Sequence, residues 1–140
     1  MRVTRVFALA LTGALLAGCG TSTVPVTTHP RDEETAQDLG ATIAEMGRCD
    51  TPDQEPSTPG GWTFLCERPH EAPEQYESFE ILVYADVAAK QQSSARLNAG
   101  GFRCKEGPFF HVIALQPAGL PEPPLRALDD FPGSFPARHP

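Results

Sequence analysis

Basic residues are scarce in this chain of 140 residues, which has 11 Lys and Arg against 18 Asp and Glu. The formal net charge is −7 at pH 7 with histidine neutral. Nucleic-acid-binding proteins use Lys and Arg to neutralise phosphates, and anionic membranes attract basic segments. The composition therefore argues against nucleic acid as a partner. It also argues against a membrane association that rests on surface charge.

Several motifs that carry chemistry are also lacking. The chain has no Cys-x-x-Cys pair, no phosphate-binding glycine loop, no dinucleotide glycine pattern and no serine nucleophile elbow. Two Cys and His pairs, Cys66 with His70 and Cys104 with His111, come nearest to a metal site, but zinc needs four clustered ligands. We therefore predict no catalytic residues, no metal site and no cofactor.

Long hydrophobic runs are absent, and the longest apolar stretch lies near the start of the chain. Two arginines precede the apolar residues 6–16. A transmembrane helix needs about 20 apolar residues, whereas about 7–15 suit the core of a signal peptide. The run ends in Leu16, Ala17, Gly18 and Cys19, which resembles the lipobox of bacterial lipoproteins. That resemblance implies cleavage between Gly18 and Cys19 and lipid on the Cys19 sulfur.

The lipobox resemblance implies a domain anchored to the extracytoplasmic face of the cell membrane. Residues 1–18 are then a signal peptide with two Arg, and the mature chain has 122 residues (140 − 18) and a formal charge of −9 (−7 − 2). Residues 19–30 are small and polar, which predicts a flexible tether. The anchor itself would hold through its acyl chains, since each buried methylene contributes about 0.8 kcal/mol.

Hydrophobic periodicity predicts one α+β domain over residues 31–116. A stripe of apolar residues at helical spacing predicts a helix over 32–47: Ala36, Leu39, Ile43 and Met46. Strands are expected at 62–66, 79–85 and 109–115, with a second helix at 87–98 after the N-cap Asp86 and a turn at 106–107. We expect two helices on one face of a 3–4 stranded, mainly antiparallel sheet. A parallel crossover over 79–115 is the open alternative.

The C-terminal residues 117–140 are rich in proline, with seven prolines after Gln116. Such a composition predicts an extended, poorly ordered tail. The alternative is that its few large apolar residues, Leu125, Leu128 and Phe131, pack back on the domain.

Three cysteines remain once Cys19 is assigned to lipid. Export permits disulfides, and a small domain gains from one. We predict a Cys49–Cys66 disulfide, which would join the end of the first helix to the first strand and leave Cys104 as a free thiol. The alternatives are a Cys66–Cys104 pair and an intermolecular bond through Cys104.

Two further groups of residues invite a functional interpretation. Four glutamates recur at every third position, at Glu71, Glu74, Glu77 and Glu80; paired carboxylates serve in glycoside hydrolysis, but a solvated acidic edge of the sheet is the favoured interpretation. Aromatic residues gather near the first two strands, at Trp62, Phe64, Tyr76, Phe79 and Tyr84. We expect them to form the core, with Tyr76 and Tyr84 the most exposed.

Over residues 1–115 the chain is similar to small, uncharacterised actinobacterial lipoproteins. The shared features are the lipobox, a helix that ends near Cys49-Asp50, a cysteine-bearing strand, a strand–helix unit and a final apolar strand. The resemblance implies no activity. We therefore expect an envelope lipoprotein with a non-catalytic binding or structural role and an envelope protein or glycan as partner. The alternative is a small enzyme or redox protein that uses Cys104 or the Glu71–Glu80 run.

Overall fold

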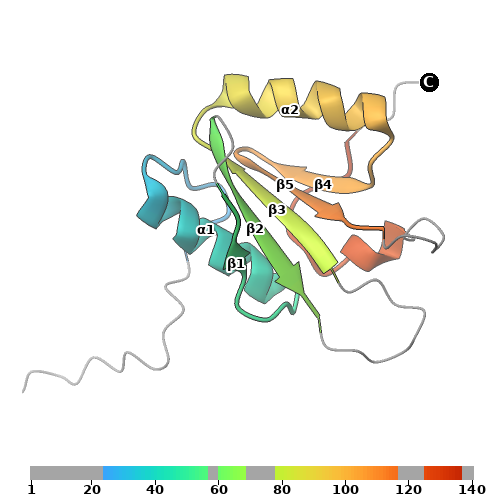
Figure 1. Ribbon diagram of the computed structural model, residues 1–140, viewed down its shortest axis with the longest axis horizontal. Coiled ribbons are helices and arrows are strands. Elements are labelled where there is room, and N and C mark those ends of the chain that lie inside the picture. Colours follow the sequence, from blue (N-terminus) through green and yellow to red (C-terminus); the bar gives the residue numbers. More distant parts are fainter. Residues whose placement is uncertain (1–23, 57–59, 69–77, 117–124, 137–140) are drawn as a thin grey trace, which may run out of the picture.

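The computed structural model describes residues 24–56, 60–68, 78–116 and 125–136. Its elements are the helices α1 (Glu33–Met46) and α2 (Val87–Gly100), five strands, and the 3₁₀ helix η1 (Leu125–Leu128). The strands are β1 (Asp53–Gln54), β2 (Gly61–Glu67), β3 (Ser78–Tyr84), β4 (Cys104–Gly107) and β5 (Phe110–Ala114). They form one sheet in the order β1-β2-β3-β5-β4 (Figure 1). The α+β prediction is confirmed, with more strands than expected.

Every pairing in the sheet is antiparallel. The longest ladder joins β2 to β3, from Gly61 opposite Tyr84 to Glu67 opposite Ser78. Strands β3 and β4 both run antiparallel to β5, so they are parallel to each other with β5 between them. Helix α2 is therefore a crossover between parallel strands, and the hairpin strand β5 fills the gap that this crossover leaves.

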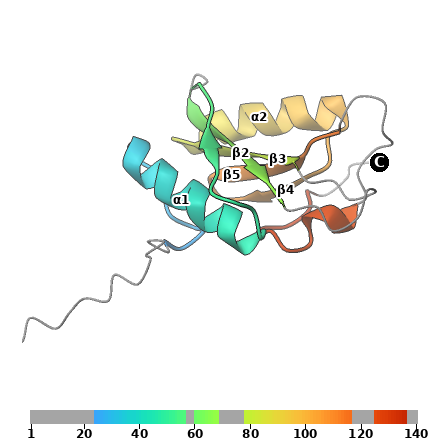
Figure 2. The ribbon, with the colours of Figure 1, turned by 60° about the horizontal axis from the view of Figure 1, so that its bottom comes forward.

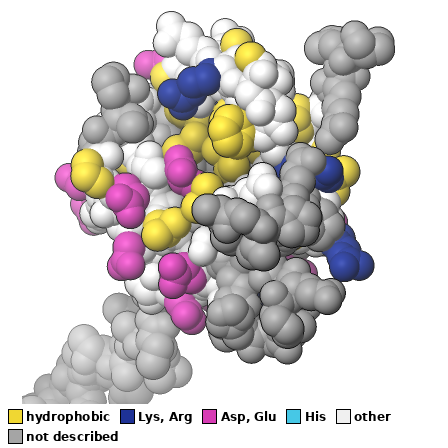
Figure 3. Space-filling view, turned by 45° about the vertical axis from the view of Figure 1, so that its right-hand side comes forward, with side chains coloured by type: hydrophobic (Ala, Val, Ile, Leu, Met, Phe, Trp, Pro, Cys, Tyr) yellow, Lys and Arg dark blue, Asp and Glu magenta, His cyan; other side chains and the backbone are white. Residues whose placement is uncertain are grey.

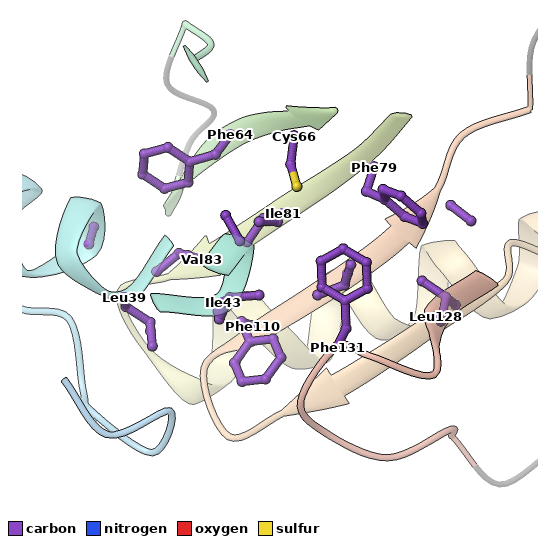
Figure 4. Packing of buried hydrophobic residues seen from close by; sticks show 14 residues of the cluster. Leu39, Ile43, Phe64, Cys66, Phe79, Ile81, Val83, Phe110, Leu128 and Phe131 are labelled. Atoms are coloured by element: carbon purple, nitrogen blue, oxygen red, sulfur yellow. The ribbon is translucent and has the colours of Figure 1, made fainter. Parts of the chain in front are cut away.

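The two helices lie on opposite faces of the sheet, which corrects the expectation that they share one face (Figure 2). Helix α1 packs on one face in a cluster that includes Leu39, Ile43, Phe64, Ile81 and Phe110 (Figure 4). Helix α2 contributes Leu97 to a smaller cluster with Leu82, Tyr84, Cys104 and Ile113. Successive residues of β3 belong alternately to the two clusters. Both faces of β3 are thus buried, as in a strand covered on two sides.

Both helices begin where capping residues favour a helix. Asp32 accepts a 2.9 Å hydrogen bond from the Thr35 amide, and Asp86 accepts one of 2.7 Å from the Ala89 amide. These bonds satisfy amides that have no partner within the helix. Gly101 ends α2 in the left-handed conformation, at φ 70°. Met46, the last residue of the predicted apolar stripe, does not join the core: 47% of its surface is exposed at the end of α1.

The predicted tether is ordered in its second half. Pro30 is buried, and Val24 and Val26 pack against the α1 cluster. The Val24 amide also donates to the Thr42 hydroxyl at 3.3 Å. Residues 24–30 are therefore part of the domain because their apolar side chains find a place beside α1. Residues 1–23, including Gly18 and Cys19, lie outside the described residues.

The expectation of a poorly ordered C-terminal tail is wrong for residues 125–136. Leu128 and Phe131 are buried in the α1 cluster, as the alternative required, while Leu125 is 39% exposed. Arg68 lies over the Phe131 ring and donates to the Ala127 carbonyl at 2.8 Å. The segment adds core to a face of the sheet that α1 covers only in part (Figure 4).

The turn of the last hairpin lies two residues later than expected. Glu106 and Gly107 belong to β4, opposite His111 and Phe110, and the turn falls at 108–109. Position 107 requires glycine, because a Cβ there would overlap the Phe110 ring. The shift places Glu106 next to His111 in the sheet. The short edge strand β1 was not among the predicted strands.

Candidate functional site

A groove of about 560 Å³ lies between α2 and the β2–β3 part of the sheet. It exists because α2 contacts β3 and leaves the outer face of β2 uncovered. Its lining residues combine apolar, hydroxyl and charged groups: Trp62, Thr63, Glu80, Leu82, Val83, Tyr84, Ala89, Gln92, Ser93 and Arg96. A hollow of this size and mixed character is typical of a site for a small ligand.

Thr63 supplies an unpartnered polar atom to this groove. The residue is 7% exposed, and its hydroxyl has no hydrogen-bond partner. It lies in β2 opposite Leu82, on the side of the sheet that faces α2. A buried hydroxyl without a partner costs about 1–3 kcal/mol. Sequence analysis did not single out Thr63; the signal was a threonine at an inward position of an apolar strand.

Glu80 supplies a carboxylate from the central strand β3. It lies opposite Leu65 on one side and Ile113 on the other. Burial raises the pKa of Glu80, an effect that Arg96 opposes. Among the described residues, the carboxylate has no hydrogen bond or salt bridge. The interpretation as an exposed acidic edge is wrong for Glu80, and Glu71, Glu74 and Glu77 lie outside the described residues.

The opposite wall of the groove comes from one side of α2. Arg96 is exposed and its guanidinium is 3.4 Å from the Ser93 hydroxyl oxygen, to which it donates. The groove thus has the positive Arg96 on the helix and the negative Glu80 on the sheet.

On the face drawn in Figure 3, acidic side chains spread over the left and lower part, and hydrophobic side chains gather in the upper half.

A chain of hydrogen bonds lies under α2 beside the groove. Tyr84 donates to Ser93 at 2.7 Å, and its oxygen lies 2.8 Å from Nδ1 of His111. Because the Tyr84 proton goes to Ser93, the His111 Nδ1 is the donor to Tyr84. Both residues are buried, which corrects the expectation of an exposed Tyr84, and desolvation raises the Tyr84 pKa to about 12. The chain is a rigid support for the groove.

The second nitrogen of His111 faces two partners. Nε2 is 3.1 Å from the Ser94 hydroxyl and 3.4 Å from Glu106 Oε2, which Lys90 also approaches at 3.5 Å. In a serine triad the hydroxyl and the carboxylate engage opposite ring nitrogens. Here both meet Nε2, so the arrangement does not activate Ser94. Burial lowers the pKa of His111, although Glu106 opposes the effect.

The cysteines follow the predicted pairing. A disulfide joins Cys49 to Cys66 across a Cα–Cα distance of 5.6 Å, and Cys104 is a free, buried thiol. Burial and the nearby Glu106 carboxylate raise the pKa of Cys104. A nucleophilic cysteine needs the reverse, a lowered pKa and exposure. Among the described residues, no cluster of three or more His, Cys, Asp or Glu could hold a metal ion, and His70 lies outside them.

The predicted aromatic residues separate into different environments. Phe64 and Phe79 are buried in the α1 cluster, as expected, and Trp62 is half-buried against it while also lining the groove. Tyr76 lies outside the described residues. Among the helices that the structure describes, none has the length and hydrophobicity to cross a membrane. Comparison with protein-family models, curated proteins and solved structures finds no match.

Proposed function

We propose that this chain is a lipid-anchored extracytoplasmic lipoprotein whose domain binds a ligand or partner in the α2 groove without catalysis. The lipobox residues Leu16 to Cys19 support the anchoring. The Cys49–Cys66 disulfide fits the oxidising compartment to which such proteins are exported. The observation that carries the binding role is the unpartnered Thr63 hydroxyl in the lining of the groove, because buried polar groups nearly always have a hydrogen-bond partner and an exception calls for an explanation.

The rival function, a thiol enzyme or redox protein, has less support. Cys104 is 4% exposed and its pKa is raised, so little thiolate forms at neutral pH. Among the described residues, the charged group that affects the Cys104 pKa is the Glu106 carboxylate, which disfavours the thiolate. The His111 ring is engaged by Tyr84, Ser94 and Glu106. The geometry therefore favours binding over nucleophilic chemistry.

The anchoring is tested by fractionating bacteria that express the full chain or its Cys19→Ala variant. We expect the parent protein in the membrane fraction and the variant in the soluble fraction, because a domain with excess acidic charge has no electrostatic attraction to anionic lipid. A Cys104→Ala variant is the matched control and should remain with the membrane. Retention of Cys19→Ala in the membrane fraction would contradict the proposed anchor.

The binding role is tested by isothermal titration calorimetry. The full-length protein in detergent is titrated with the low-molecular-mass fraction of its own cell envelope while the heat of binding is recorded. We expect a saturable change that Ala89→Arg abolishes, because the long side chain fills the groove. Ala95→Arg makes the same change at an exposed position of α2 and should leave the response intact. No response in the parent protein would overturn the binding role.

A further inference from the structure

The groove has the chemistry of a site for an uncharged, polyhydroxylated ligand, and the argument starts from its charges. Glu80 on the sheet and Arg96 on the helix both line the groove, and among the described residues no salt bridge joins them. An anionic ligand that reaches Arg96 also meets Glu80 and a strongly acidic domain. A cationic ligand that reaches Glu80 meets Arg96. A neutral ligand avoids both conflicts.

Hydroxyl groups suit the three polar positions better than other neutral groups do. A carboxylate only accepts hydrogen bonds, a guanidinium only donates them, and a hydroxyl does both. One ligand hydroxyl can therefore donate to Glu80 while another accepts from Arg96. A third can pair with Thr63, whose own hydroxyl has no partner. In the free domain this hydroxyl is buried, so a change of the Thr63 χ1 rotamer would be needed to bring it to a ligand in the groove.

The apolar part of the lining matches the carbon faces of a sugar ring. Leu82, Ala89 and the aromatic residue Tyr84 line the groove on the α2 side of the sheet. Small-ligand sites combine such apolar walls with a few placed polar groups, within hollows of about 300–1,000 Å³. The groove, at about 560 Å³, lies within that range.

We propose that the α2 groove binds a mono- or disaccharide unit through Glu80, Arg96 and Thr63, with the sugar ring against its apolar wall. This inference rests on the proposed binding role of the groove and names the class of ligand. It requires no covalent or redox step. It also explains why Thr63 and Glu80 remain without partners in the described part of the domain.

The test uses the full-length protein in detergent and records the heat of binding by isothermal titration calorimetry during titration with defined probes. The probes are glucose, N-acetylglucosamine and a set of neutral disaccharides, with an arginine-containing tripeptide and citrate as charged alternatives. We expect saturable binding of at least one neutral sugar and none of the charged probes. Glu80→Gln should weaken sugar binding about tenfold or more, since hydrogen bonds to charged groups are the stronger ones. Glu34→Gln, at an exposed position of α1, should have no effect.

Thr63 provides a variant that separates ligand binding from folding. Thr63→Val keeps the shape and removes the unpartnered hydroxyl, so we expect a higher melting temperature together with about tenfold weaker sugar binding. Thr63→Ser keeps the hydroxyl and should bind as the parent does. Unchanged sugar affinity in Thr63→Val, or no binding of any neutral sugar, would overturn the inference. If the envelope fraction still gives the Ala89→Arg-sensitive response, the binding role survives that result and only the ligand class is wrong.

Discussion

The ammonium of Lys105 donates a hydrogen bond of 2.8 Å to the carbonyl oxygen of Phe131. Lys105 is 8% exposed, and it also donates to the Asp129 carbonyl at 3.3 Å. The carbonyls of Asp129 and Phe131, just after η1, thus both accept hydrogen bonds from one side chain of β4. The side chain also lies under the Phe135 ring, 5.2 Å from its centroid. Lys105 therefore fixes the C-terminal segment to strand β4, and Arg68 fixes the same segment to the end of β2.

Replacing Lys105 by methionine should destabilise the domain by about 2 kcal/mol. The variant keeps most of the apolar stem but leaves the Phe131 and Asp129 carbonyls without their charged donor. Urea unfolding at neutral pH measures the change. Arg126→Met removes a basic residue from the exposed side of η1 and should change the free energy by about 0.5 kcal/mol or less. Equal effects of the two substitutions would contradict the role of Lys105.

A chain that ends at Gln116 should lose most of its stability. It lacks Leu128 and Phe131, and truncation of a single buried Leu or Phe to Ala already costs about 2–5 kcal/mol. A domain of this size has only about 5–15 kcal/mol in total. Circular dichroism during thermal unfolding should show a low or absent transition. A chain that ends at Pro136 should melt as the full chain does, and a stable domain ending at Gln116 would show that the segment is dispensable.

Removal of the disulfide should cost about 3 kcal/mol. The bond closes a loop of 17 residues, and the chain-entropy model gives about that value for such a length. The experiment compares Cys49→Ala/Cys66→Ala with its parent in a Cys19→Ala background, with and without reductant. Reductant should lower the parent melting temperature to that of the variant and leave Cys104→Ser variants as sensitive as the parent. A thiol assay of the denatured, unreduced parent should find one free thiol, and three would exclude the bond.

The stability of the domain should fall as the pH decreases below about 6.5. Burial lowers the pKa of His111 from its usual 6.5, so the unfolded chain binds a proton more readily than the folded chain. The contribution is complete above pH 6.5 and is lost as the pH falls toward the lowered pKa, by at most about 1.4 kcal/mol per pH unit. Urea midpoints between pH 7.5 and 5 measure the slope. His111→Phe should flatten it, whereas His29→Phe, at an exposed residue, should not; equal slopes in all three proteins would contradict the assignment.

Local features of the sequence predicted the elements better than their arrangement. The N-cap Asp86 correctly marked the start of α2, and the apolar stripe correctly predicted the position of α1. In β3, side chains alternate between the two faces of the sheet, as in any strand. Leu82 and Tyr84 are large hydrophobic residues, as Ile81 is, so both sides of this strand needed a cover and the helices could not share one face.

The features that depend on contacts distant in sequence were the hardest to predict. Leu128 and Phe131 are two apolar residues among many prolines, and only the uncovered part of the α1 face explains why they are buried. The groove depends on how much of β2 the helix α2 leaves uncovered, and the hydrophobic periodicity of the sequence does not predict this. The unpartnered state of Thr63 is likewise a property of its surroundings, since a threonine in a strand is ordinary in itself.

If the proposed lipid anchor is correct, the packing of residues 24–30 limits how far the domain can move from the membrane. If lipid is attached at Cys19, five peptide units separate it from Val24, where the folded part begins. A chain extends by at most about 3.3–3.6 Å per residue, so this link spans less than about 18 Å. Such a link is shorter than the width of a compact domain of about 100 residues, whose radius of gyration alone is about 13 Å. The groove would therefore sample only the layer of the envelope next to the bilayer, and its ligands would have to be found there.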